Sequence, residues 1–239
     1  MNLLRIWVLI VSLGAAMFLA PSAAIAVPLS TLFQGESISN GRLTFSDWAL
    51  ISLQSANGGS ADFDQINVFP ISDDPLNSGI AYVGPSGALG IPSTHPGASS
   101  LRLSFSYRVH TNNGLPLIEE HSARLTGYNF FATNSTRIQV IQLAEHPSGA
   151  DLSEIVSFVR PSDLADSPNL FSSEAFFQRQ TALRITTTID VAGLQANDFA
   201  QLTAFQQRFV SAIPEPSGAA ISAVLLLCLW ACGSRAGRK

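Results

Sequence analysis

The sequence is short of charge and of cysteine, and both shortages narrow the kind of protein it encodes. Asp, Glu, Lys and Arg make up 13% of the 239 residues, against about 25% in a typical soluble protein. Both cysteines, Cys228 and Cys232, lie in an apolar segment near the C-terminus. The rest of the chain therefore has neither a disulfide nor a cysteine nucleophile, and its own hydrophobic core must stabilise it.

Lysine is absent from the central part of the chain, residues 27–213. This part has nine Arg against sixteen Asp and Glu, a formal net charge of −7 with His neutral. Such a balance repels nucleic acid. It also repels anionic polysaccharide and lipid headgroups unless cations bridge them. The charge excludes nucleic acid as a partner and identifies no other.

The N-terminal segment, residues 1–26, has the pattern of a secretory signal peptide. An apolar run from Ile6 to Leu19 follows a short start with one arginine, and small residues lead up to Ala24 and Ala26. Small side chains at these two positions suit signal peptidase, which would cut after Ala26 and make Val27 the new N-terminus. We therefore expect the protein to be exported.

The C-terminal segment, residues 212–239, combines three features in a fixed order. An extended Pro-Glu-Pro motif comes first, then an apolar stretch of 17 residues, then a basic end; the motif is Pro214, Glu215 and Pro216, and the basic residues are Arg235, Arg238 and Lys239. The apolar stretch is at the short limit for a helix that spans a bilayer. The basic tail would stay on the cytoplasmic side, so the domain before it would face outward.

This arrangement resembles the PEP-CTERM sorting signal of exosortase systems and covers about the last 26 residues. The resemblance implies that an exosortase recognises Pro214, Glu215 and Pro216 and removes the tail, so that the helix anchors the protein only transiently. It also implies a destination at the cell surface or outside the cell, in bacteria that make exopolysaccharide. A permanent single-span anchor is the alternative.

Between the two ends, residues 27–211 have the pattern of an antiparallel β-sandwich. Leu101 to Val109 and Leu183 to Val191 alternate apolar and polar residues without error, which is typical of half-buried strands. We expect further strands at Gly41–Phe45, Gln65–Ile71, Ile80–Val83, Leu117–Thr126, Arg137–Leu143, Ile155–Val159 and Phe205–Ser211. Clusters of Gly, Pro, Asn, Asp and Ser between them favour turns. Two packed sheets with jelly-roll topology fit this pattern, and only Glu174–Thr181 and Asn197–Ala204 offer a turn or two of helix.

The sequence contains little that supports catalysis. It has no Gly-x-Ser-x-Gly motif, and its four histidines, His95, His110, His121 and His146, are too scattered for a zinc hydrolase and are expected at the surface or at strand ends. The acidic pairs Asp62/Asp64, Asp73/Asp74 and Glu119/Glu120 would serve a glycosidase only at a spacing that the sequence does not define. We expect no enzyme and no cofactor.

Calcium is the one ligand that local composition suggests. Asp62, Asp64, Asp73 and Asp74 place four carboxylates near turns, and Ca²⁺ prefers clustered carboxylate and carbonyl oxygens. The segment does not match an EF-hand, because Asn67 stands where the glycine of that loop belongs.

Three functions remain. The first is a structural or interaction protein of the surface or extracellular matrix, with signal peptidase, an exosortase, the membrane and exopolysaccharide as partners. The second is a carbohydrate- or calcium-binding sandwich module, and the third is a secreted hydrolase. Exposed aromatic residues on one concave face or a convergence of the aspartates would indicate the second function, and a deep cleft with two carboxylates at catalytic spacing would indicate the third.

Overall fold

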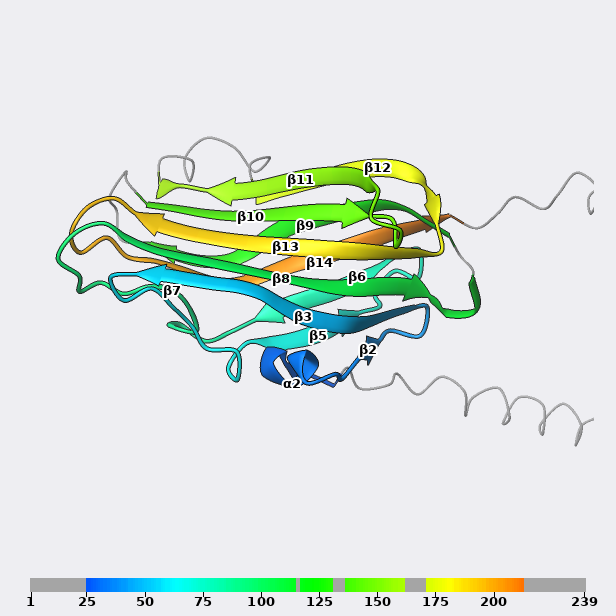
Figure 1. Cartoon of the computed structure of the whole chain (residues 1–239), viewed down its shortest axis with the longest axis horizontal. Coiled ribbons are helices and arrows are strands. Elements are labelled where there is room, and N and C mark those ends of the chain that lie inside the picture. Colours follow the sequence, from blue (N-terminus) through cyan, green and yellow to red (C-terminus); the bar gives the residue numbers. More distant parts are fainter. Residues whose placement is uncertain (1–24, 115–116, 131–135, 162–170, 213–239) are drawn as a thin grey trace, which may run out of the picture.

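The two strictly alternating segments pair with each other along their whole length. They form β8 (Ser99–Thr111) and β13 (Ala182–Gly193), which run antiparallel with Leu103 opposite Ile189. The computed structural model describes residues 25–114, 117–130, 136–161 and 171–212, and Figure 1 shows this pair in the middle of a sheet. The strict alternation therefore marks central strands with one buried face.

We call this six-stranded layer sheet B. Its strand order is β11-β10-β13-β8-β3-β2, and Figure 1 shows β11, β10, β13, β8 and β3 one below another. The remaining members are β2 (Ile38–Ser39), β3 (Leu43–Ala56), β10 (Thr136–Glu145) and β11 (Asp151–Val159). All its pairs are antiparallel.

The eight-stranded layer, sheet A, is built around β14 (Ala200–Ala212). This strand pairs with β9 on one side and with β6 and β7 on the other. The other members are β1 (Val27–Pro28), β4 (Ser60–Ala61), β5 (Asn67–Ile71), β6 (Asn77–Val83), β7 (Leu89–Ile91), β9 (Leu117–Phe130) and β12 (Ser172–Gln180). The chain is thus an all-β protein of two antiparallel sheets.

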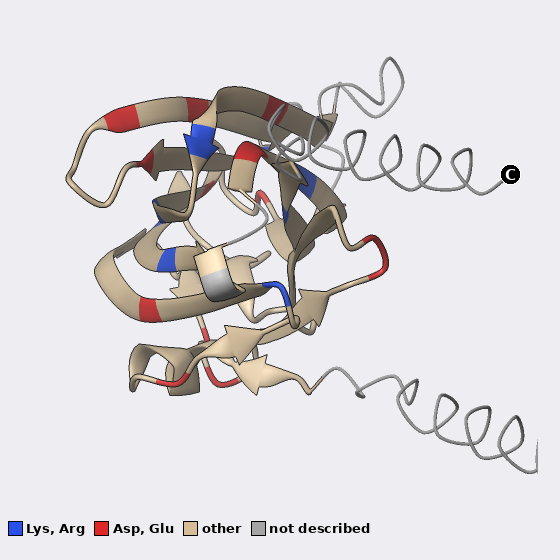
Figure 2. Ribbon diagram, turned by 90° about the vertical axis from the view of Figure 1, so that its right-hand side faces the viewer, with Lys and Arg blue, Asp and Glu red and all other residues tan. Residues whose placement is uncertain are grey.

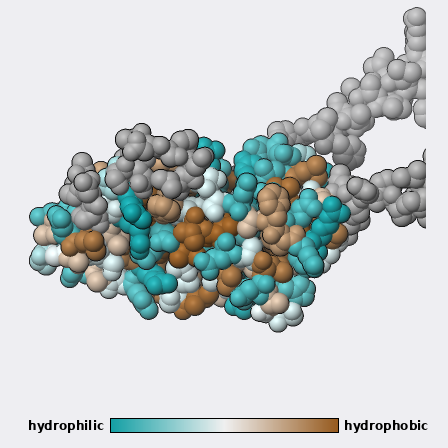
Figure 3. Space-filling view, turned by 90° about the horizontal axis from the view of Figure 1, so that it is seen from above, coloured by the Kyte–Doolittle hydropathy of each residue, from teal (hydrophilic) through white to brown (hydrophobic). Residues whose placement is uncertain are grey.

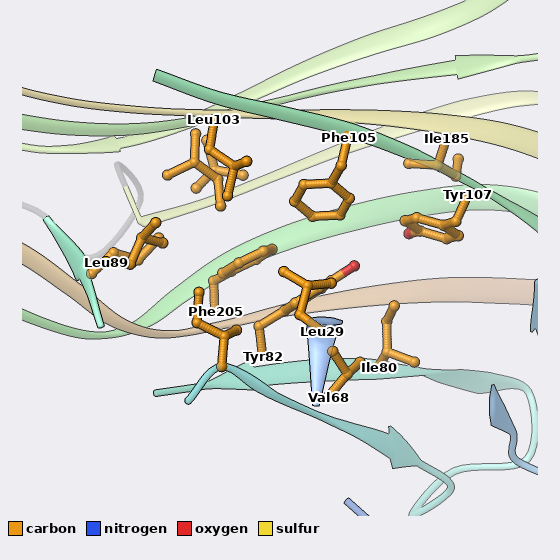
Figure 4. Packing of buried hydrophobic residues seen from close by; sticks show 14 of the residues in the cluster. Leu29, Val68, Ile80, Tyr82, Leu89, Leu103, Phe105, Tyr107, Ile185 and Phe205 are labelled. Carbon is orange, nitrogen blue, oxygen red and sulfur yellow. The ribbon is translucent and has the colours of Figure 1, made fainter. Parts of the chain in front are cut away.

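The core lies between the two sheets. Figure 4 shows Phe105 and Tyr107 of sheet B pointing toward Tyr82 and Phe205 of sheet A. The rings of Tyr82 and Phe205 stack with centroids 4.2 Å apart, and those of Trp48 and Tyr107 with centroids 4.4 Å apart. Aromatic side chains that bury large areas compensate for the missing disulfides.

Each of the nine predicted strands overlaps a strand of the structure, but both helical expectations are wrong. Glu174–Thr181 lies almost entirely in β12, whose residues pair with β9, and the end of Asn197–Ala204 belongs to β14. Pairing with a neighbouring strand outweighs the weak helical pattern. The α-helix in the described ranges is α2 (Leu29–Phe33), and η1 (Asn112–Gly114) is a 3₁₀ turn. No helix in these ranges is long and apolar enough to cross a membrane.

The surface in these views mixes charged, polar and hydrophobic side chains. Figure 2 shows acidic and basic residues spread over both strands and loops. Figure 3 shows hydrophobic side chains in small groups among hydrophilic ones. Phe176 on β12 is the most exposed large aromatic among the described residues, with 70% of its surface accessible. Binding by such a surface depends on local geometry rather than on overall charge.

Candidate functional site

A surface cavity of about 260 Å³ lies on the outer face of sheet B. It is formed where β3, β8 and β13 lie side by side, and the turn between β10 and β11 borders it. The residues that line it include Asp47, Ala49, Ser106, Arg108, Pro147 and Arg184. Its volume is near the lower end of small-molecule sites, about 300–1,000 Å³.

Two small side chains, Ala49 and Ser106, line the cavity between the charged ones. Every second residue of β8 and β13 points away from the core, and these positions include Ser104, Ser106, Thr186 and Thr188. The hydroxyls of Ser104 and Thr188 lie 3.1 Å apart across the two strands. Ser104 and Ser106 are nevertheless buried, so larger neighbouring side chains cover this part of the sheet.

A β-bulge places Asp47 at the edge of the cavity. Ser46 pairs with Arg108 and Ala49 with Ser106, so that β3 has one more residue than β8 in this interval. Asp47 adopts φ 55° and is exposed, which is uncommon for a residue with a Cβ. The next residue, Trp48, turns into the core, and its Nε1 donates to the carbonyl oxygen of Phe45 at 3.2 Å. The bulge thus directs a carboxylate outward and an indole inward.

Two arginines lie directly opposite each other in the cavity. Arg108 of β8 and Arg184 of β13 are partners in the strand register, and both are exposed. Within the described residues neither forms an ion pair. Glu145 is opposite Arg184 on the other side, but its Oε2 accepts from Thr186 Oγ1 at 3.5 Å. The cavity therefore combines two guanidinium groups, one carboxylate and one serine hydroxyl.

A second cavity lies in the core and is too small for an organic ligand. Its volume is about 10 Å³, and its lining includes Leu29, Tyr82 and Phe205. A space of this size holds at most one water molecule, so the interior offers no binding site there.

Three of the four candidate calcium ligands, Asp62, Asp73 and Asp74, have other partners for their carboxylates. Asp62 accepts from the backbone N–H of Asp64 at 3.1 Å and from the side chain of Gln65 at 2.7 Å. Asp73 receives two hydrogen bonds of 2.9 Å from Arg208, which lower the pKa of its carboxyl. Asp74 accepts from the backbone N–H of Leu76.

These contacts give the calcium hypothesis no support. The carboxylates stabilise turns and an ion pair, as Asp does in many loops. No group of three or more His, Cys, Asp or Glu side chains within the described ranges is arranged to hold a metal ion. The four aspartates therefore do not converge as a shared site.

The acidic pair on β9 is not part of the cavity either. Glu119 forms an ion pair of 2.9 Å with Arg179. Burial raises the pKa of Glu120, and the nearby carboxylates of Glu174 and Glu119 add to this. Since Asp47 is the one carboxylate among the residues lining the cavity, the cavity lacks the carboxylate pair of a glycosidase.

Two of the four histidines are not at the surface as expected. His95 is buried, and its Nε2 lies 2.7 Å from the carbonyl oxygen of Asp198. His121 is 1% exposed, with Nε2 2.9 Å from Ser153 Oγ. Burial lowers the pKa of His121 to about 4, so that it is neutral at physiological pH and contributes to the core.

Most of the predicted targeting residues are outside the described residues. These are Ala24, Pro214, Glu215, Pro216, Arg235, Arg238 and Lys239. Ala26 and Val27 are described, and Val27 is the first residue of β1, where it pairs with Val68.

Comparisons with known proteins give weak structural similarities. No family model and no curated protein matches the sequence. The carbohydrate-binding module TmCBM61, solved with β-1,4-galactotriose, is 14% identical with a TM-score of 0.28, covering 62% of this chain and 90% of its own. The mannan-recognising module TmCBM27 is 10% identical with a TM-score of 0.29, covering 79% and 96%.

An enzyme is among the similar structures as well. Endoglucanase 3 of Trichoderma harzianum, from family GH12, is 8% identical with a TM-score of 0.23, covering 74% of this chain and 99% of its own. At such identities and TM-scores, none of these similarities assigns a function to this chain.

Proposed function

We propose that the domain is a non-catalytic carbohydrate-binding module of an exported protein. The observation that carries the proposal is the cavity on sheet B, where Asp47, Arg108 and Arg184 line the same space as two small side chains. Sugar hydroxyls both donate and accept hydrogen bonds, and a carboxylate beside guanidinium groups offers partners of both kinds. The volume suits one sugar unit of a longer chain.

The strand order supports a jelly-roll topology for this module. From β7 onward the chain visits the two sheets alternately, apart from the β10–β11 hairpin. The resulting orders are β6-β14-β9-β12 in sheet A and β8-β13-β10-β11 in sheet B. Both follow the double Greek key of a jelly roll.

The two ends of the chain are the basis for proposing export. The predicted cut after Ala26 leaves Val27, which is the first residue of β1. At the other end, β14 stops at Ala212, two residues before the Pro-Glu-Pro motif. Both proposed processing sites thus adjoin the folded domain, which supports export, tail removal by an exosortase and a final location at the surface or in the matrix.

Binding is tested by isothermal titration calorimetry on the full chain in mild detergent. The probes are soluble neutral and acidic oligosaccharides, and reducing ends are measured in the same samples. We expect saturable binding to at least one saccharide and no increase in reducing ends. Release of reducing ends would show that the protein is a hydrolase and not a binding module. Absence of binding to every probe would contradict the proposal.

Processing is tested by intact-mass analysis of the protein from the host envelope and medium, with and without its exosortase. We expect a species that begins at Val27 and ends near residues 214–216 only when the exosortase is present. Retention of Lys239 in both strains would indicate a permanent anchor instead.

A further inference from the structure

We propose that the cavity on sheet B selects an acidic sugar residue, whose carboxylate or sulfate group binds between Arg108 and Arg184. This inference rests on the proposed function and specifies the class of saccharide. The domain is negatively charged overall and should repel an anionic sugar. Binding of such a sugar therefore requires a local arrangement of positive charge.

The local cause is the register of β8 and β13. Directly opposite residues of an antiparallel pair have Cα atoms about 4.5–5.5 Å apart, and like charges at such positions destabilise the sheet. Arg108 and Arg184 are such a pair. An anion bound between them would remove the repulsion, which favours occupation of the site.

The other arginines show that pairing with acids is available in this fold. Arg137 forms an ion pair with Asp190, Arg179 with Glu119, and Arg208 with Asp73. Acidic residues outnumber arginines in residues 27–213 by sixteen to nine. Arg42, Arg102, Arg124 and Arg160 also lack an ion pair in the described structure. Arg108 and Arg184 differ from them in lying directly opposite each other in the strand register.

Guanidinium groups suit an oxyanion geometrically. Each is planar and offers five N–H donors, and a carboxylate or sulfate accepts two parallel bonds from one such group. Asp47 lines the same cavity and provides an acceptor for a hydroxyl of the same sugar. Its negative charge also disfavours a second anion close by, so that one acidic group per site is expected.

Long-range repulsion does not prevent this contact. The Debye length is about 8 Å at physiological ionic strength, so acids on distant strands are screened while the two arginines act at contact distance. Because the pair is exposed, salt should weaken binding of the acidic ligand more than binding of a neutral one.

The test compares three saccharides of similar length on the full chain in mild detergent. Trigalacturonate supplies carboxylates, a sulfated galactose oligomer supplies sulfates, and galactotriose is the neutral control. We expect the preferred acidic ligand to bind about tenfold or more tightly than galactotriose, as charge-assisted hydrogen bonds imply. The two acidic ligands distinguish a carboxylate site from a sulfate site.

The variants Arg108→Gln and Arg184→Gln should each lose about tenfold in affinity for the acidic ligand and little for galactotriose. Arg124→Gln is the matched control, since Arg124 is an exposed arginine on β9 of the other sheet. It should bind like the unmodified protein. Removing one of two like charges leaves the fold intact, which circular dichroism verifies.

The possible outcomes separate the two proposals. Binding of galactotriose as tight as that of both acidic ligands, or unchanged acidic binding in both arginine variants, overturns the acidic preference while the carbohydrate-binding function stands. No binding of any saccharide overturns both.

Discussion

His121 is a residue that the core holds in its neutral form. It is 1% exposed, and within the described structure its Nδ1 has no hydrogen-bond partner. A charged imidazole here would lose its hydration without gaining an acid as partner, which is why its pKa falls to about 4.

This predicts loss of stability in acid. In the unfolded chain His121 binds a proton near pH 6.5, and in the folded chain near pH 4. Above pH 6.5 it is neutral in both states, so its protonation does not lower the free energy of unfolding there. The free energy of unfolding declines as the pH falls toward 4, by roughly 3 kcal/mol at most.

Urea unfolding between pH 7 and pH 4 measures this dependence. The variant His121→Gln should show a flatter profile, and His146→Gln, at a turn outside the core, should follow the unmodified protein. Equal slopes in all three proteins would show that His121 is not the group responsible.

Phe209 contributes to stability through aromatic packing. It is 1% exposed, and its ring centroid lies 5.8 Å from that of Phe45. Phe209→Ala should lower the free energy of unfolding by about 3–5 kcal/mol, because it leaves a cavity between the sheets. Phe176→Ala, at a residue 70% exposed, should change it by about 0.5 kcal/mol or less. Similar losses in both variants, measured by urea unfolding, would contradict the assignment of the core.

At the scale of the strands, the close approach of β6 and β14 depends on a glycine. A Cβ at Gly79 would lie 1.9 Å from the carbonyl oxygen of Gln207, so the backbone of one strand would have to move. Gly79→Ala should therefore destabilise the protein by about 1–3 kcal/mol.

Gly97 provides the matched control, since a Cβ there meets no atom within 4 Å. Gly97→Ala should leave the thermal midpoint unchanged or slightly raised. A fall of the same size in both variants would mean that loss of glycine flexibility, rather than the contact with β14, is the cause.

How much of the fold the sequence predicts depends on the strand. Leu101–Val109 and Leu183–Val191 were identifiable because central strands with one buried face alternate strictly. β12 was not, because an edge strand has a partner on one side only, and its polar residues fit a helical period equally well. The short strands β1, β2, β4 and β7 have two or three residues each, too few to define any period.

The candidate site was harder to predict than the strands. Arg108 and Arg184 are 76 positions apart in the sequence, and only the register of β8 and β13 makes them neighbours. Asp47 joins them because of a bulge that no local pattern marks. Three of the aspartates that the sequence did favour, Asp62, Asp73 and Asp74, are engaged in turns and an ion pair.

At the scale of the whole molecule, the two sheets form a scaffold with a shallow site on one outer face. A saccharide should bind directly to that face, and hydrogen–deuterium exchange of the full chain locates where it binds. With the tightest-binding oligosaccharide, we expect slower exchange in the peptides around residues 47–49, 106–108 and 184, and unchanged exchange on the outer face of sheet A. Protection confined to sheet A, or none at all under saturating ligand, would contradict the account.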